Sequence, residues 1–166
     1  ALAGVKFYVD RGYDGIKIYN SMKTELVPVI TKAAHHAGKK VTGHIPVHML
    51  ANEAVKAGYD GIEHINMLFL NFLATHETDT RDITRFTLIA EHASELDLKS
   101  KEVKAFLKLL HDKKTIVDPT LDAFEPMSAA GPGEVPAGTE ALVSRLPLNA
   151  QRGWLVNGLP GMDLEQ

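Results

Sequence analysis

The chain has 166 residues, which is enough for one domain with a hydrophobic core. Its 18 basic and 21 acidic residues give a net charge of −3, which excludes the basic surface typical of proteins that bind nucleic acids or anionic membranes. Cysteine is absent, so disulfides, thiolate metal sites and cysteine nucleophiles are excluded, and no apolar run approaches the ~20 residues that span a bilayer.

The first ten residues lack the basic and then apolar pattern of a signal peptide, and the chain does not begin with methionine. We therefore expect a soluble protein, either cytoplasmic or exported, and a segment of a longer product. A closed eight-stranded β/α barrel usually needs ~250 residues, so a complete barrel of that kind is not expected.

An internal repeat organises the first part of the chain. Residues 1–11 read as the end of a helix, and the sequence Gly-Tyr-Asp-Gly-Ile follows at residues 12–16 and again at 58–62, which is 46 residues later. A third short β-prone segment lies between the two copies, at residues 40–44. The spacing of about 23 residues is the length of one strand and one helix with tight loops.

The segments between these strands have helical periodicity. Residues 25–37 place apolar side chains on one stripe, and residues 48–57 do the same over a shorter length. Each helix ends at a glycine that is followed by a β-prone run. This alternation predicts an α/β fold with parallel strands and right-handed crossovers.

The alternation of predicted strands and helices is less regular after Ile65. Residues 66–76 are apolar without a clear period, residues 82–96 read as a helix, and Ser100 is expected to cap a further helix. A fourth strand is predicted at residues 115–121. Residues 122–166 are expected to be mostly loop with a short helix at 139–146, so we treat residues 1–166 as a single fragment with no second domain.

Three side chains stand where parallel strands would end. They are Lys17, His44 and His64, and the two histidines each lie six residues past the glycine that ends the preceding helix. Adjacent parallel strands are ~4.8 Å apart, so two imidazoles at matching depth can converge on one cation. The alternative interpretation is that each is a hydrogen-bonded structural residue.

Other polar residues are interpreted as structural. Asp14 and Asp60 precede their strands, so they face the opposite end of the sheet and are expected to form turns. The pair His35 and His36 is expected to lie on a solvated helix surface.

The sequence resembles the metal-dependent amidohydrolase superfamily, and most closely its imidazolonepropionase-like and Xaa-Pro dipeptidase-like branch. The resemblance rests on the motifs Gly-Ile-Lys-Ile-Tyr at 15–19, Ala-Ala-His-His-Ala-Gly-Lys-Lys-Val-Thr-Gly-His-Ile-Pro at 33–46 and Ala-Gly-Tyr-Asp-Gly-Ile-Glu-His-Ile at 57–65. It covers residues 12–66 well, and the Pro-Thr-Leu at 119–121 resembles the end of the next strand of the family.

This resemblance implies a (β/α)₈ barrel, of the TIM type, with one or two divalent metal ions, usually zinc. It implies that Lys17 is the lysine that becomes carboxylated and bridges two metals, and that His44 and His64 are metal ligands. A metal-bound water would then attack an amide or similar carbonyl of a small-molecule substrate. Tyr19 and His48 lie just past strand ends and are candidates for binding a substrate carboxylate.

The sequence also departs from the family. No His-x-His pair occurs anywhere in it, and no strand after Leu121 carries the family's metal-binding Asp. We therefore expect a partial barrel of about four β/α units, the fourth to the seventh, that is inactive by itself and pairs with another copy or with the missing half. Two alternatives are a β/α barrel enzyme in which Lys17 forms a Schiff base, and a non-catalytic interaction domain on the same scaffold.

Overall fold

A computed structural model describes residues 1–122, 124, 130–131 and 133–155 of the chain. The chain divides into two compact units, Ala1–Pro119 and Thr120–Gln166, which are described separately. The described residues form eight α-helices and four short strands, so the fold is mixed α/β. Among them, no helix is both long and apolar enough to cross a membrane.

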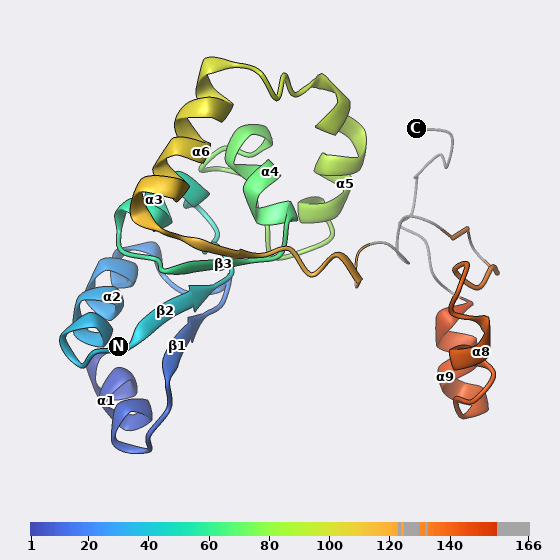
Figure 1. The fold of residues 1–166 in the computed structure, drawn as a ribbon, viewed down its shortest axis with the longest axis horizontal. Coiled ribbons are helices and arrows are strands. Elements are labelled where there is room, and N and C mark those ends of the chain that lie inside the picture. The colour runs from blue at the N-terminus through green and yellow to red at the C-terminus, as the bar shows by residue number, and fades with distance from the viewer. Residues whose placement is uncertain (123, 125–129, 132, 156–166) are drawn as a thin grey trace. The chain divides into compact units, whose positions relative to one another are not determined.

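The strands of the first unit are all parallel. β1 (Gly15–Ile18) pairs with β2 (Lys40–Gly43), and β3 (Gly61–Glu63) pairs with β4 (Ile116–Asp118). The two pairs are separate sheets, but β2 and β3 lie side by side (Figure 1), and the Asp60 N–H donates to the Val41 carbonyl at 2.8 Å. The predicted α/β class and parallel strands are confirmed, whereas the described residues do not close a barrel.

Helices alternate with these strands along the chain. α1 (Leu2–Asp10) precedes β1, and β1 is followed by a 3-10 turn, η1 (Thr24–Leu26), and α2 (Val27–His36). After β2 comes α3 (Ala51–Lys56). After β3 come α4 (Asn66–Leu73), α5 (Thr84–His92), a second 3-10 turn, η2 (Ala93–Glu95), and α6 (Lys101–Lys113).

The core forms where the apolar stripes of these helices meet the strands. α2 buries Val27, Ile30 and Ala34, which are spaced by three and four residues and lie on one face of a helix. α6 buries its own stripe in the same way (Val103, Phe106 and Leu110). The predicted cap of α6 is confirmed, because the Ser100 hydroxyl oxygen accepts the Val103 N–H at 3.2 Å.

Two helices differ from the sequence prediction: α3 begins later than expected, and α4 forms where no helix was predicted. The predicted helix at 48–57 begins only at Ala51, because residue 48 has a left-handed backbone (φ 67°) that a helix cannot contain. The segment at 66–76, which has no clear period, forms α4, since it is nearly apolar all round and its polar positions do not mark one face.

The second unit contains α8 (Glu140–Val143), within the predicted helix at 139–146, and α9 (Leu148–Trp154), which was not predicted. The part of the prediction for 122–166 that falls on residues 123, 125–129, 132 and 156–166 lies outside the described residues.

Candidate metal site

The carboxyl ends of β1, β2 and β3 bring the candidate site together. His44 directly follows β2, and its N–H donates to the Ile18 carbonyl at 3.0 Å, which extends the pairing of β1 with β2. The preceding residue, Gly43, has a φ of 136°, and a Cβ built on it would lie 2.1 Å from the Ile18 carbonyl oxygen. Only glycine allows this close approach of the two strands, and the approach sets the position of His44.

The two histidines predicted as metal ligands lie next to each other. Their ring centroids are 4.5 Å apart. His64 has a left-handed backbone (φ 74°), and its N–H donates to the Asp118 carbonyl at 2.7 Å, so β4 holds it in place. One ligand atom from each of His44, Glu63 and His64 lies within 4.8 Å of the others, so this group could hold a metal ion.

The His44 imidazole is kept neutral. Its residue is only 6% exposed, and burial lowers the pKa of His44 to about 4, with further lowering because protonated His44 and His64 rings would repel each other and because the Lys17 ammonium is nearby. Its Nδ1 atom is buried and has no hydrogen-bond partner. A buried nitrogen without a partner is costly in free energy, and coordination of a cation would remove that cost.

Glu63 is the residue of this group that sequence reasoning did not single out. Successive residues of a strand point to opposite faces, so Glu63 and His64 would not be expected to share a site. The positive φ of His64 ends the extended geometry between them, and both reach the same group. The position of Glu63 at the carboxyl end of a predicted strand was the available sequence signal for including it in the site. The change of backbone direction at His64 was not visible in the sequence.

Lys17 reaches the same group through Glu63. The Lys17 ammonium forms an ion pair with the Glu63 carboxylate, and the Thr42 hydroxyl donates to that carboxylate at 3.1 Å. Burial raises the pKa of Glu63, but these two hydrogen bonds outweigh it and hold the pKa below its usual value. Glu63 is therefore an anion beside two neutral imidazoles.

The two candidate substrate residues are placed differently. The Tyr19 ring lies 4.3 Å from the His44 ring, and Tyr19 is 52% exposed, so it borders the site on the solvent side. His48 is held by the loop after α4, because its Nδ1 donates to the His76 carbonyl at 2.6 Å.

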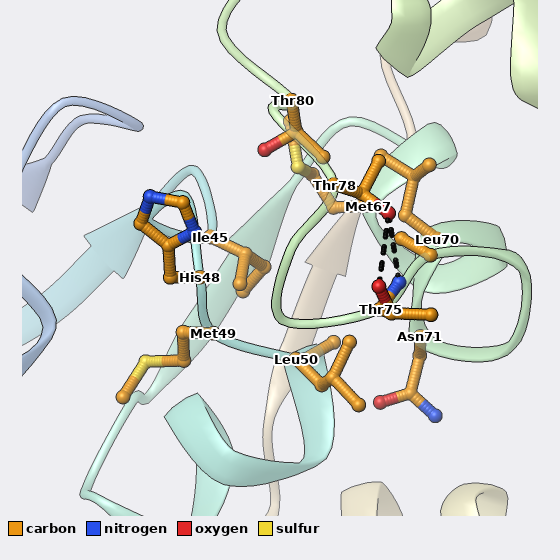
Figure 2. A pocket seen from close by; sticks show the side chains of 12 residues that line it. Ile45, His48, Met49, Leu50, Met67, Leu70, Asn71, Thr75, Thr78 and Thr80 are labelled. Atoms are coloured by element: carbon orange, nitrogen blue, oxygen red, sulfur yellow. Dashed lines mark hydrogen bonds between the residues drawn. The ribbon is translucent and has the colours of Figure 1, made fainter.

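His48 also lines a small hollow with Met49, Leu50, Thr75 and Thr78 (Figure 2). The hollow has a volume of about 10 Å³, which is room for at most one water molecule. It is therefore too small to be a substrate pocket.

Comparison with protein-family models, with curated proteins and with solved structures gave no match. The site is therefore defined by its own geometry. Two imidazoles and one carboxylate are a donor set that suits divalent ions such as zinc, and the buried Nδ1 of His44 fits that use. The described residues thus contain a candidate site for a divalent cation at the carboxyl ends of parallel strands, where β/α proteins carry their active sites.

Proposed function

We propose that this chain is part of a metal-dependent hydrolase of amide or other C–N bonds, and that its parallel strands belong to a (β/α)₈ barrel of the amidohydrolase type. The substrate class is a dipeptide, an N-acyl amino acid or a cyclic amide. The motifs at residues 15–19, 33–46 and 57–65 support this proposal. It is also supported by the place of the site at the carboxyl ends of successive parallel strands.

The observation that carries the proposal is the state of His44. A structural histidine in a core normally has both ring nitrogens engaged, or one of them exposed to water. Here the imidazole is buried and neutral, its Nδ1 has no partner, and a second imidazole and a carboxylate lie beside it. A buried neutral imidazole with a free ring nitrogen, next to a second imidazole and a carboxylate, has the donor chemistry of a metal ligand.

In the proposed site His44, His64 and Glu63 would hold a divalent ion such as zinc, which would supply an activated water and polarise a substrate carbonyl. Carboxylation would convert Lys17 into an anion, which would repel Glu63 and turn toward the cation instead. Tyr19 borders the site and is proposed to orient the substrate, with His48 as the second candidate.

Zinc titration of the purified chain by calorimetry tests this proposal. We expect the intact chain to bind zinc and the variants H44N and H64N to lose affinity by about 100-fold or more, because each removes one of three ligands. The matched control is H36N, since His36 is an exposed histidine on α2. Equal zinc affinity in the intact chain, H44N and H64N would exclude this site.

Turnover is a separate matter, because the sequence contains neither the His-x-His pair nor, after Leu121, the strand with the metal-binding Asp that the amidohydrolase resemblance requires. We expect no hydrolysis of dipeptides by this chain alone. Measurable hydrolysis at one metal equivalent would contradict the interpretation that the catalytic site is incomplete.

We also propose that the chain pairs with another copy or with the rest of the barrel, since Ile116 of β4 is 73% exposed. A dilute monomer in light scattering would contradict pairing.

The two alternatives predict different results. A Schiff-base enzyme would be trapped by borohydride on Lys17 with a carbonyl substrate, and no such adduct is expected while the ammonium pairs with Glu63. A non-catalytic interaction domain would keep its partner after H44N, whereas the zinc site would be lost.

A further inference from the structure

Tyr59 is a buried tyrosine whose hydroxyl contacts the backbone of the candidate site from the interior of the first unit. It lies two residues before β3 and belongs to the hydrophobic core, where it is only 3% exposed. Its hydroxyl donates to the His44 carbonyl at 2.9 Å. Burial raises the pKa of Tyr59, so this hydroxyl keeps its proton and remains a donor.

Both backbone polar groups of His44 are held by other segments of the first unit. Its N–H donates to the Ile18 carbonyl at the end of β1, and its carbonyl accepts the hydroxyl of Tyr59, which lies between α3 and β3. The residue before it, Gly43, is in close contact with the Ile18 backbone. Because the backbone is fixed on both sides of His44, the direction in which its side chain leaves the strand is fixed as well.

The internal repeat contains a second tyrosine that makes no such contact. Tyr13 occupies the position of Tyr59 in the first copy of Gly-Tyr-Asp-Gly-Ile, but it is 54% exposed, and its ring packs edge to face against Tyr8 at 5.2 Å. Phenylalanine would fill the core position of Tyr59 equally well, so packing does not explain the hydroxyl. The buried carbonyl of His44 does explain it, since that carbonyl needs a donor.

We infer that Tyr59 is a positioning residue, which through the His44 carbonyl holds the His44 ring beside His64 and Glu63; this inference rests on the proposed function. Without the hydroxyl, the buried carbonyl would lose its partner, and the peptide bond after His44 would turn toward another donor. A metal site needs its ligands held to within about 0.5 Å, so a small turn of that peptide weakens the site. Tyr59 acts through the backbone and is not itself a ligand.

The test is Y59F, with Y13F as the matched control, because each removes one hydroxyl from the same position of the repeat. The readouts are the zinc dissociation constant, the free energy of unfolding, and the nuclear Overhauser effect between the His44 and His64 rings, whose centroids are 4.5 Å apart. We expect Y59F to weaken zinc binding about tenfold or more, and to reduce the ring-to-ring effect in the metal-free chain. Y13F should leave all three unchanged.

A purely structural role for Tyr59 gives a different result. Y59F would then be less stable, but the folded variant would bind zinc as tightly as the intact chain and would keep the ring-to-ring effect, and this outcome overturns the inference. If Y59F does not fold, hydrogen exchange of the Tyr59 hydroxyl in the intact chain decides instead. A bond that positions a ligand must be stabilised when zinc binds, so exchange should slow with zinc, and an unchanged rate also overturns the inference.

The failure of the proposed function is distinguishable from the failure of this inference. An intact chain that binds no zinc would contradict the metal site. The ring-to-ring effect in metal-free Y59F and Y13F would still show whether the Tyr59 hydroxyl sets the place of the His44 ring.

Discussion

The two ends of β2 and β3 carry polar clusters with opposite properties. At the amino end, both oxygens of Asp60 are satisfied. Oδ1 accepts Lys40 at 2.8 Å, and Oδ2 accepts the His35 ring at 2.7 Å and the Val41 N–H at 2.9 Å. This cluster joins α2, β2 and β3 through one carboxylate, so its polar groups stabilise the fold.

At the carboxyl end the polar groups are close together but not all matched. The Nδ1 atom of His44 has no partner, and the backbones of Gly43 and His64 lie in the positive-φ region. Strain and unsatisfied groups of this kind destabilise a fold and persist where function requires them. The comparison therefore indicates that the cluster around Asp60 at the amino end stabilises the strands. The group at the carboxyl end has the unsatisfied polar atoms expected of a ligand-binding site.

The largest effect is expected at the carboxyl end, from G43A. The added Cβ would overlap the Ile18 carbonyl oxygen, and the residue would keep a φ that alanine rarely adopts. We expect a loss of about 4 kcal/mol in the free energy of unfolding, measured by urea denaturation. Zinc affinity should fall as well, because His44 would move with β2.

The control for G43A is G4A. Gly4 lies inside α1 with no atom within 4 Å of an added Cβ, so alanine should stabilise the helix by about 0.5–1 kcal/mol. If G43A were as stable as the intact chain, the close approach of β1 and β2 would not be what sets the position of His44.

The next effect is the pH dependence that His44 produces in the metal-free chain. The pKa of His44 is lowered from 6.5 to about 4 in the folded state, so the unfolded state binds more protons between these values. Stability should therefore fall as the pH decreases from 6.5 to 4, by about 3 kcal/mol in total. The measurement is the difference between the intact chain and H44N in urea denaturation across this range, in the presence of a chelator.

That difference isolates His44 from the other histidines. Pairing with Glu95 raises the pKa of His92, which gives the opposite slope, and this contribution is common to both chains. Parallel stability curves for the intact chain and H44N would mean that His44 is not held neutral by the fold.

Much of the candidate site at the carboxyl ends of β2 and β3 could be predicted from the sequence. The repeat and the helix-ending glycines gave the spacing of the strands, and that spacing placed His44 and His64 at equivalent strand ends, where the structure puts their rings side by side. Glu63 was not identified, because its place beside the two histidines depends on the positive φ of His64, which has no local sequence signal.

The amino end shows the limit of a repeat as a guide. Asp14 and Asp60 occupy the same position of two identical five-residue copies, and both were expected to form turns. Only Asp60 meets a histidine and a lysine, because α2 carries His35 to it, and His35 was expected to be solvated surface. The copies are locally equal, so the difference arises from tertiary packing that the motif does not encode.

A smaller effect is therefore expected from D60A, with D14A as its sequence-equivalent control. D60A removes three contacts of a half-buried carboxylate and leaves the Val41 N–H without its acceptor, so we expect a loss of about 2 kcal/mol in the free energy of unfolding. D14A should lie within about 0.5 kcal/mol of the intact chain, since Asp14 is exposed. Zinc affinity should be unchanged in both, and a loss of zinc binding in D60A would break the division between the two ends.

The smallest effect is expected from K40M, which removes one partner of Asp60 and keeps most of the side-chain volume. The Lys40 side chain is 74% exposed, and an ion pair in contact with water is worth less than about 1 kcal/mol. The loss in urea denaturation should be a small part of that in D60A, and it should shrink further at high salt. If K40M cost as much as D60A, the amino end would depend on this one ion pair. We expect instead that the larger share comes from the Val41 N–H and His35, which tie β2 and α2 to the same carboxylate.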